Sequence, residues 1–128
     1  MLSDLEFERY RKQLNLPEWR KQQQMRLKEA KILVVGAGGL GCGALPFLAA
    51  AGVGFITILD ADVIELSNLA RQVLYKTEDV GASKALKSAE ALQALNPTIT
   101  IQGIAENLTA ANASSYIAQH DLIIDCTD

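Results

Sequence analysis

The feature that most constrains the fold is a short apolar run that leads directly into a glycine-rich loop. Residues 32–35 read Ile-Leu-Val-Val, and residues 36–41 read Gly-Ala-Gly-Gly-Leu-Gly. A continuous apolar run of this length predicts a strand that is buried on both faces of a parallel sheet. The glycine pattern after it predicts a tight turn into a helix over 40–51, an arrangement that holds the phosphates of a nucleotide.

The rest of the chain alternates strands and helices. Further strands are predicted at 55–59, 99–101 and 122–126, further helices at 80–95 and 109–119, and a loop with a short helical turn at 63–77. This alternation predicts an α/β, Rossmann-like, doubly wound and mainly parallel sheet of about four strands. We expect Asp79 and Thr109 to cap the later helices, and Pro46 to bend the 40–51 helix or to mark a short first turn.

An N-terminal helical arm precedes this domain. Ser3 and Glu6 have the spacing of a capping box, which predicts a helix over 4–14. Pro17 suits the first position of a second helix over 17–29. The expected organisation is an arm at 1–30 and a Rossmann-like nucleotide-binding domain at 31–128.

The sheet is expected to continue beyond this chain. Only two residues follow the 122–126 strand. In sheets of this type ligands bind beyond the carboxyl ends of the strands, so the last residue falls where chemistry is expected. The chain is therefore predicted to be a truncated fold.

Composition and charge exclude several classes of protein. The sequence lacks the charged start and following apolar stretch of a signal peptide, and none of its apolar runs is long enough for a membrane span. Cys42 and Cys126 are the only cysteines, which favours a cytoplasmic protein in which both pack as small buried residues. The body is acidic and no basic–aromatic array is present, so nucleic acid is not an expected partner.

The charge is unevenly distributed along the chain. Residues 1–31 carry eight Lys/Arg and five Asp/Glu, whereas residues 32–128 carry four and ten, for a net charge of −3. The basic arm is either a solvated helix surface or a segment that reaches toward phosphate or an acidic partner.

The glycine loop and the acid after the second strand have distinct expected roles. Gly36 permits the tight turn, Gly38 lets the backbone approach phosphate, and Gly41 lets the helix pack closely on the strand. Asp60 ends the second strand, where an acid accepts hydrogen bonds from ribose hydroxyls; the alternative is that it caps the next loop. Asp62 is equally well explained as a solvated acid. Up to this point NAD and ATP fit equally well.

The following loop favours ATP. It carries Asn68 and Arg71, and Lys84 falls close to the start of the next helix, where the helix dipole disfavours a cation unless an anion lies nearby. Surface ion pairing is the alternative for Arg71 and Lys84 taken singly. Together the three residues predict a polyphosphate clamp, which suits a reaction at the α-phosphate better than hydride transfer.

These motifs give the chain a clear family resemblance. It resembles the adenylating enzymes of the ubiquitin-activating superfamily, specifically the bacterial MoeB/ThiF/HesA group, over essentially its whole length. The matching residues are Arg9-Tyr10-Arg11-Lys12-Gln13-Leu14, the glycine loop at 36–41, Leu59-Asp60-Ala61-Asp62, Leu66-Ser67-Asn68-Leu69-Ala70-Arg71-Gln72, Val80-Gly81-Ala82-Ser83-Lys84 and Asp125-Cys126-Thr127-Asp128.

The resemblance implies an ATP- and magnesium-dependent adenylyltransferase that acts on the C-terminal glycine carboxylate of a small ubiquitin-like sulfur-carrier protein, for molybdopterin or thiamin biosynthesis. It also implies a homodimer, with no nucleic acid or membrane partner. Carried over by position, Gly39 and Gly41 cradle the nucleotide, and Asp60 holds the ribose. The resemblance also implies that Ser67, Asn68 and Arg71 face the phosphates. It implies that Lys84 neutralises the pyrophosphate and that Asp128 ligates magnesium.

Three departures qualify this resemblance. The family's arm usually reads Arg-Tyr-Ser/Asn-Arg-Gln, and its second arginine reaches the partner subunit's phosphates; here Lys12 takes that place and lacks the guanidinium fork. The family's paired CxxC zinc motifs would lie beyond residue 128, so zinc is expected only there. The surface for the carrier's tail is expected there too, and His120 is interpreted as an ordinary loop residue.

Two alternatives remain open from the sequence. One is an NAD-binding Rossmann oxidoreductase, and the other is a non-catalytic chain that binds nucleotide or only dimerises. The sequence does not distinguish between molybdopterin, thiamin and other pathways, and a chain that stops at Asp128 is expected to show little turnover.

Overall fold

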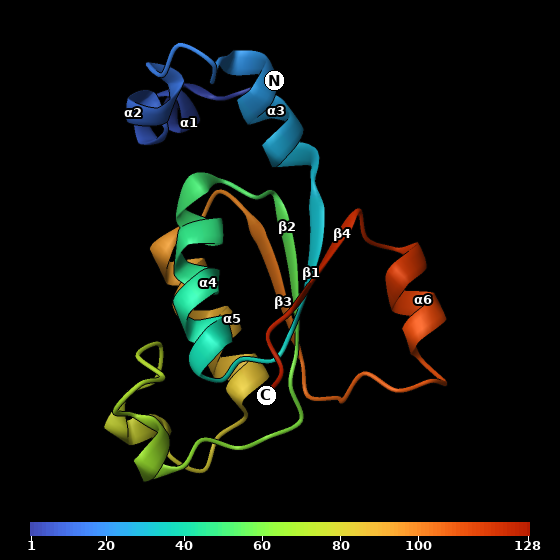
Figure 1. Ribbon diagram of the computed structural model, residues 1–128. Coiled ribbons are helices and arrows are strands. Elements are labelled where there is room, and N and C mark those ends of the chain that lie inside the picture. The colour runs from blue at the N-terminus through green and yellow to red at the C-terminus, as the bar shows by residue number, and fades with distance from the viewer.

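The computed structural model describes residues 1–128 as a four-stranded, all-parallel sheet with helices on both faces (Figure 1). The strands are β1 (Lys31–Val35), β2 (Phe55–Leu59), β3 (Thr100–Ile104) and β4 (Leu122–Asp125), and their order in the sheet is β3-β2-β1-β4. Helices α4 (Gly39–Ala51) and α5 (Lys84–Leu95) cover one face, and α6 (Ala113–Ala118) lies on the other. The predicted Rossmann-like parallel sheet is therefore confirmed.

The central strand β1 is buried on both faces, as its uninterrupted apolar sequence predicts. Ile32 and Val34 belong to the larger core cluster, which packs against α4 and α5, whereas Leu33 and Val35 belong to a smaller cluster on the α6 side. Because both faces are covered, the carboxyl end of β1 lies in the middle of the sheet edge, and the glycine loop starts there.

The N-terminal helices are shorter than predicted. They are α1 (Asp4–Arg9), α2 (Arg11–Leu14) and α3 (Lys21–Glu29). The continuous helix expected over 4–14 is broken at Tyr10, whose side chain is buried. The placement of Pro17 at a helix start is wrong, because Pro17 lies in a turn and α3 begins at Lys21.

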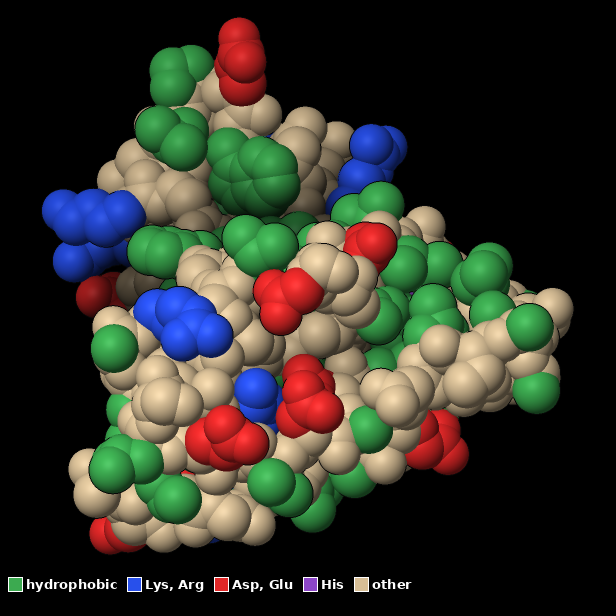
Figure 2. All heavy atoms as spheres, turned by 60° about the horizontal axis from the view of Figure 1, so that its bottom comes forward, with side chains coloured by type: hydrophobic (Ala, Val, Ile, Leu, Met, Phe, Trp, Pro, Cys, Tyr) green, Lys and Arg blue, Asp and Glu red, His purple; other side chains and the backbone are tan.

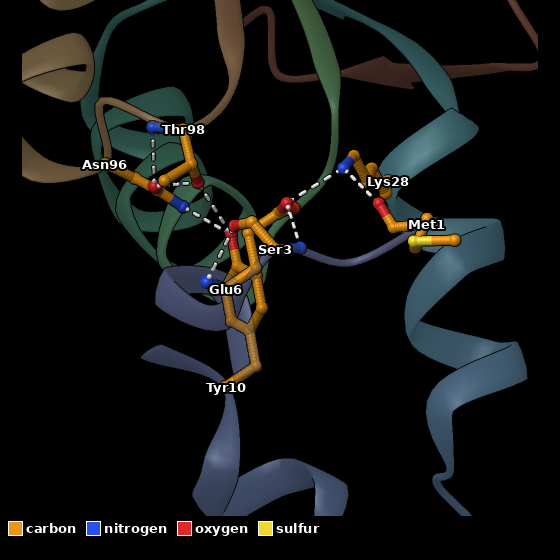
Figure 3. A network of polar contacts seen from close by, with 7 residues as sticks. All are labelled: Met1, Ser3, Glu6, Tyr10, Lys28, Asn96 and Thr98. Atoms are coloured by element: carbon orange, nitrogen blue, oxygen red, sulfur yellow. Dashed lines mark hydrogen bonds and ion pairs between the residues drawn. The ribbon is translucent and has the colours of Figure 1, made fainter. Parts of the chain in front are cut away.

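Polar contacts anchor these helices to the start of the sheet (Figure 3). The predicted capping box between Ser3 and Glu6 is present, and Lys28 Nζ lies 2.8 Å from Glu6 Oε1. The Tyr10 hydroxyl lies 2.9 Å from Asn96 Nδ2 and 3.2 Å from Thr98 Oγ1. These partners precede β1 and β3, so the arm sits where the strands begin, at the top of Figure 1.

The later helices α5 and α6 are also shorter than predicted, because each begins later in the chain. Helix α5 begins at Lys84 and is capped by Ser83; Asp79 instead accepts from Lys76 N at 2.8 Å, in the short 3₁₀ helix η2 (Thr77–Asp79). Helix α6 has Asn112 at its N-cap, although Thr109 does accept a bond from Asn112 N.

The remaining features concern α4 and membrane spans. Pro46 lies inside α4 and does not mark a short first turn. None of the helices combines the length and the hydrophobicity that a membrane span needs.

Candidate nucleotide-binding site

A cavity of about 880 Å³ opens at the carboxyl edge of the sheet. It lies among the ends of β1, β2 and β4, the start of α5 and the loop that follows β2. Figure 2 brings this edge toward the viewer and shows basic and acidic side chains close together on it. The charged and amide side chains used below are Asp60, Asp62, Asn68, Arg71, Gln72, Lys84, Asp125 and Asp128.

The glycine loop has the conformation that its sequence predicts. Gly36 has φ +100°, and a Cβ there would lie 2.7 Å from the carbonyl oxygen of Cys126. A Cβ on Gly41 would lie 2.2 Å from the carbonyl oxygen of Gly36. Gly38 caps the 13-residue helix α4, so free N–H groups of its first turn face the end of the sheet, where they favour an anion.

Asp60 holds the glycine loop as well as facing the cavity. Its Oδ2 accepts a hydrogen bond from Ala37 N at 2.8 Å, and its Oδ1 accepts one from Asp62 N at 2.8 Å. The carboxylate is half-buried and lines the cavity. Each oxygen has further acceptor capacity, so the side chain can orient the loop and accept ribose hydroxyls at the same time.

Lys84 is a buried cation at the start of a helix. It is the first residue of α5, and its side chain is only 9% exposed. Its Nζ lies 3.9 Å from Oδ2 of Asp62, a side chain that is 76% exposed. The predicted position in the first helical turn is confirmed, and the contact with Asp62 keeps the alternative of ion pairing open beside that of a phosphate-binding cation. An ammonium so placed, against the helix dipole, favours an anion in the cavity.

The loop after β2 brings three further side chains to the cavity. Asn68 is buried, and its Oδ1 accepts from Glu65 N at 2.9 Å. Arg71 is exposed and forms no ion pair. Its side chain passes over the glycine loop, since a Cβ on Gly39 would lie 3.8 Å from the Arg71 side chain. Gln72 is 3% exposed, and its Oε1 has no hydrogen-bond partner. A Cβ on Gly38 would lie 3.6 Å from Gln72 Nε2.

Acidic residues after β4 border the same cavity. Asp125 and Asp128 line it, and hydrogen bonds from the hydroxyl and the N–H of Thr127 lower the pKa of Asp125. The chain has no group of three or more His, Cys, Asp or Glu side chains arranged to hold a metal ion. A lone carboxylate nevertheless fits Mg²⁺, which is usually held by one or two carboxylates together with substrate phosphates and water.

Four predicted residues do not line the cavity. Gly39 and Gly41 belong to the first turn of α4, directly after Gly38, which does line it. Ser67 is exposed on the loop after β2, in the 3₁₀ helix η1 (Leu66–Asn68), with its neighbour Asn68 facing the cavity instead. Lys12 is exposed on α2, at the end of the sheet where the strands begin. Its own cavity lies at the opposite end of the sheet, farther away than the length of a five-residue strand, which is about 16 Å.

The structure adds residues that sequence reasoning did not select. Gln72 was visible as a second amide beside Arg71, but its burial follows from the turn in which Gln72 N bonds to Asn68 O. His120 is half-buried, and its ring nitrogens lie 2.6 Å from Tyr116 O and 2.9 Å from Thr57 Oγ1. It lies in the predicted loop between α6 and β4, although no signal in the sequence indicates these contacts.

The two cysteines pack as predicted. Cys42 and Cys126 are buried and unpaired. Burial raises the pKa of both thiols, so neither has the character of a reactive thiolate.

Comparisons with known proteins point to one family. A family model described as the ThiF family matches residues 10–128. The chain is 47% identical over 123 residues to the sulfur carrier protein adenylyltransferase of Thermus thermophilus, covering 96% of this chain and 45% of that protein. It is 45% identical over 127 residues to the molybdopterin-synthase adenylyltransferase of Escherichia coli, covering 99% and 51%. The chain thus spans about half the length of these relatives.

Solved structures with the same fold include nucleotide complexes. The Escherichia coli dehydratase TcdA in complex with ATP superposes with a TM-score of 0.92 at 29% identity, covering 100% of this chain and 52% of that chain. Escherichia coli MccB, in complex with AMPCPP and MccA, superposes with a TM-score of 0.72 at 35% identity, covering 78% and 30%.

Proposed function

Because this chain belongs to the ThiF family, we propose that it is the nucleotide-binding part of an enzyme that adenylates the C-terminal carboxylate of a small ubiquitin-like sulfur-carrier protein. The observation that carries the proposal is the convergence of Gly38, Asp60, Arg71 and Lys84 on one cavity at the carboxyl edge of the sheet. The names of the Thermus thermophilus and Escherichia coli relatives support the reaction class.

The nucleotide would bind along the line of these residues. The ribose hydroxyls donate to Asp60, and the phosphates lie over the N-terminus of α4, where free N–H groups and the helix dipole favour negative charge. The guanidinium of Arg71 and the amide of Asn68 donate to phosphate oxygens, with Ser67 supporting the same loop. Gly39 leaves room beside the Arg71 side chain, and Gly41 lets α4 start directly against the carbonyl oxygen of Gly36. Arginine suits this role because its fork matches two phosphate oxygens at once.

The chemistry would be a displacement at the α-phosphate. An oxygen of the carrier's terminal carboxylate attacks that phosphorus, the bond between it and the oxygen bridging to the β-phosphate breaks, and an acyl-adenylate and pyrophosphate are formed. A carboxylate is already a nucleophile, so no general base is needed. Lys84 stabilises the charge that builds up on the leaving pyrophosphate, and this preorganised charge is worth most in a cavity that excludes water.

Magnesium would be held by Asp128 together with phosphate oxygens. When bound, the ion supplies additional positive charge to the polyphosphate. The carboxylate of Asp125 borders the same space, but its Oδ1 accepts bonds from Thr127, at 2.6 Å from Oγ1 and 3.0 Å from N, so it is better suited to holding this turn.

We further propose that the enzyme is a homodimer in which Lys12 serves the partner's cavity. Lys12 lies at the opposite end of the sheet from its own cavity and is exposed. A two-fold dimer would make any such contact twice, and the basic excess of the arm suits the phosphates it would approach.

The nucleotide choice can be tested by thermal protection. We expect ATP with magnesium to raise the melting temperature, whereas NAD and NADH at the same concentration do not, because only the triphosphate reaches Arg71 and Lys84 together. Protection by NADH alone would instead support an oxidoreductase.

The reaction itself can be tested by exchange of labelled pyrophosphate into ATP. The full-length protein should catalyse this exchange only when a sulfur-carrier protein with a free C-terminal glycine is present. Binding of ATP without any exchange would contradict the proposed catalysis and would support a nucleotide-binding chain without turnover.

A further inference from the structure

A buried tyrosine hydroxyl lies between the glycine loop and the start of α5. Tyr75 is 5% exposed, and its Oη donates a hydrogen bond to the carbonyl oxygen of Ala37 at 2.5 Å. The carbonyl oxygen of Lys84 lies 3.4 Å from the same hydroxyl. Tyr75 does not itself line the cavity, so it can act on a bound ligand only through these neighbours.

The Ala37 peptide is thereby held on both of its sides. Its N–H is bound by Asp60 Oδ2 at 2.8 Å, and its carbonyl oxygen by the Tyr75 hydroxyl, with the Cys42 thiol as a weaker second donor at 3.5 Å. The two following residues are glycines, which have the widest backbone freedom. The position of the phosphate-binding turn therefore depends on how firmly Ala37 is fixed.

The same hydroxyl also contacts the residue that carries the cation, although its single proton is donated to Ala37 O, so the carbonyl oxygen of Lys84 at 3.4 Å is only a weak second acceptor. The backbone N–H of Lys84 donates to Asp62 O at 3.1 Å, which ties the start of α5 to the segment after β2. Tyr75 adds a contact on the carbonyl side of Lys84. Burial, together with the nearby Cys42 thiol, raises the pKa of Tyr75 far above its usual value. The hydroxyl therefore stays protonated and remains a donor over the working pH range.

We propose that Tyr75 is a positioning residue that fixes the glycine loop and Lys84 relative to each other, so that the polyphosphate bound at the loop and the Lys84 amine meet at the right separation. The inference rests on the proposed adenylation and names a residue that supports it from outside the cavity. Its expected effect is on rate rather than on binding, because a displacement of about 1 Å can cost 10²-fold in rate while a flexible polyphosphate still binds.

The test is Tyr75→Phe in the full-length protein, which keeps the ring and removes only the hydroxyl. The loss of a single hydrogen bond is small beside the stability of a domain of this size, so the variant should fold, and urea unfolding checks this. In pyrophosphate exchange we expect kcat to fall at least about tenfold while the KM for ATP, and its Kd by calorimetry, stay within about threefold.

The matched control is Thr57→Val. It also removes a single hydroxyl with a hydrogen-bond partner, His120 Nε2 at 2.9 Å, from a half-buried position in β2 that neither lines the cavity nor belongs to the arm. We expect it to lower stability without lowering kcat. Equal falls in kcat in the two variants would show that rate follows stability, and an unchanged kcat in Tyr75→Phe would show a purely structural role; either result would overturn the positioning role. Failure of the wild-type protein to catalyse exchange would instead refute the proposed function, and the positioning role with it.

Discussion

The contacts that anchor the N-terminal helices can be measured with Tyr10→Phe. Tyr10 is 3% exposed, and its hydroxyl accepts from Asn96 Nδ2 at 2.9 Å and donates to Thr98 Oγ1 at 3.2 Å (Figure 3). Asn96 is fully buried, and its other Nδ2 proton is taken by Ala49 O at 2.7 Å. The variant keeps the ring and removes the acceptor, so one buried amide proton loses its partner.

The size of the effect follows from that single unpaired group. Leaving a buried donor unsatisfied costs about 1–3 kcal/mol. Thr98 adds little, because its own hydroxyl still donates to Asn96 Oδ1 at 2.6 Å. The expected loss in free energy of unfolding is therefore about 1–3 kcal/mol, a substantial fraction of the stability of a domain of this size.

Urea denaturation followed by far-UV circular dichroism measures this loss. The midpoint should fall with no change in the slope m, because the surface exposed on unfolding is unchanged. Tyr116→Phe is the control, since the Tyr116 hydroxyl bonds to Glu106 at an exposed site, and we expect it to change stability by less than about 0.5 kcal/mol. A loss below that size in Tyr10→Phe would show that Asn96 finds another partner and that the arm is not anchored by this contact.

Four further outcomes are expected. Asp60→Ala should weaken ATP binding by about 1–3 kcal/mol in calorimetry, the cost of lost hydrogen bonds to a charged group, and an unchanged affinity would remove Asp60 from the ribose role. Lys84→Ala should lower the rate of adenylation more than it raises the KM for ATP; normal pyrophosphate exchange would reduce Lys84 to a structural charge. Mixing Lys12→Ala subunits with Arg71→Ala subunits should restore partial activity, because a heterodimer regains one intact site; heterodimers that form without any recovery would contradict action across the interface. Burial alone would raise the pKa of Glu6, but hydrogen bonds from Lys28 and Ser3 leave it below the usual value of about 4.3. A carboxyl group with a lowered pKa in the folded state stabilises the protein above its unfolded-state pKa, and this stability is lost as the pH falls through the folded-state pKa. The Glu6→Gln variant should therefore lose less free energy of unfolding than the wild type between neutral pH and about pH 3. Equal losses in the two proteins, measured by urea unfolding at each pH, would count against this ion pair.

The sheet and the glycine loop follow from local sequence because the signals there are short-range. The apolar run at 32–35 is buried on both faces, and the requirements at Gly36 and Gly41 are met within the turn itself. Asp60 and Lys84 fall at the cavity because parallel strands bring their carboxyl ends to one edge.

The helix boundaries were harder to predict because tertiary contacts decide them. Tyr10 interrupts the first helix where its side chain turns inward to Asn96, which is 86 residues away in sequence. Gly81 has φ +91° and separates Asp79 from the helix that it was expected to cap, so Ser83 takes that position. Pro17 fits a turn as well as a helix start, and local sequence does not separate the two.

The role of Tyr75 could not be predicted for a different reason. In the sequence, Tyr75 is one aromatic residue in a loop. Nothing in the neighbouring residues shows whether its ring only packs or its hydroxyl also binds a specific carbonyl oxygen. The contact with Ala37 joins residues 38 positions apart, so only the folded chain reveals it.

The placement of the arm at the beginning of the strands, with the cavity at their ends, has a consequence for enzymology. A side chain on α2 is separated from its own cavity by more than the length of a five-residue strand, which is about 16 Å. Any help that Lys12 gives to catalysis is then a bimolecular event between two protomers. Specific activity should consequently depend on enzyme concentration and fall on dilution below the dissociation constant of the pair, whereas ATP binding by each separated chain should persist.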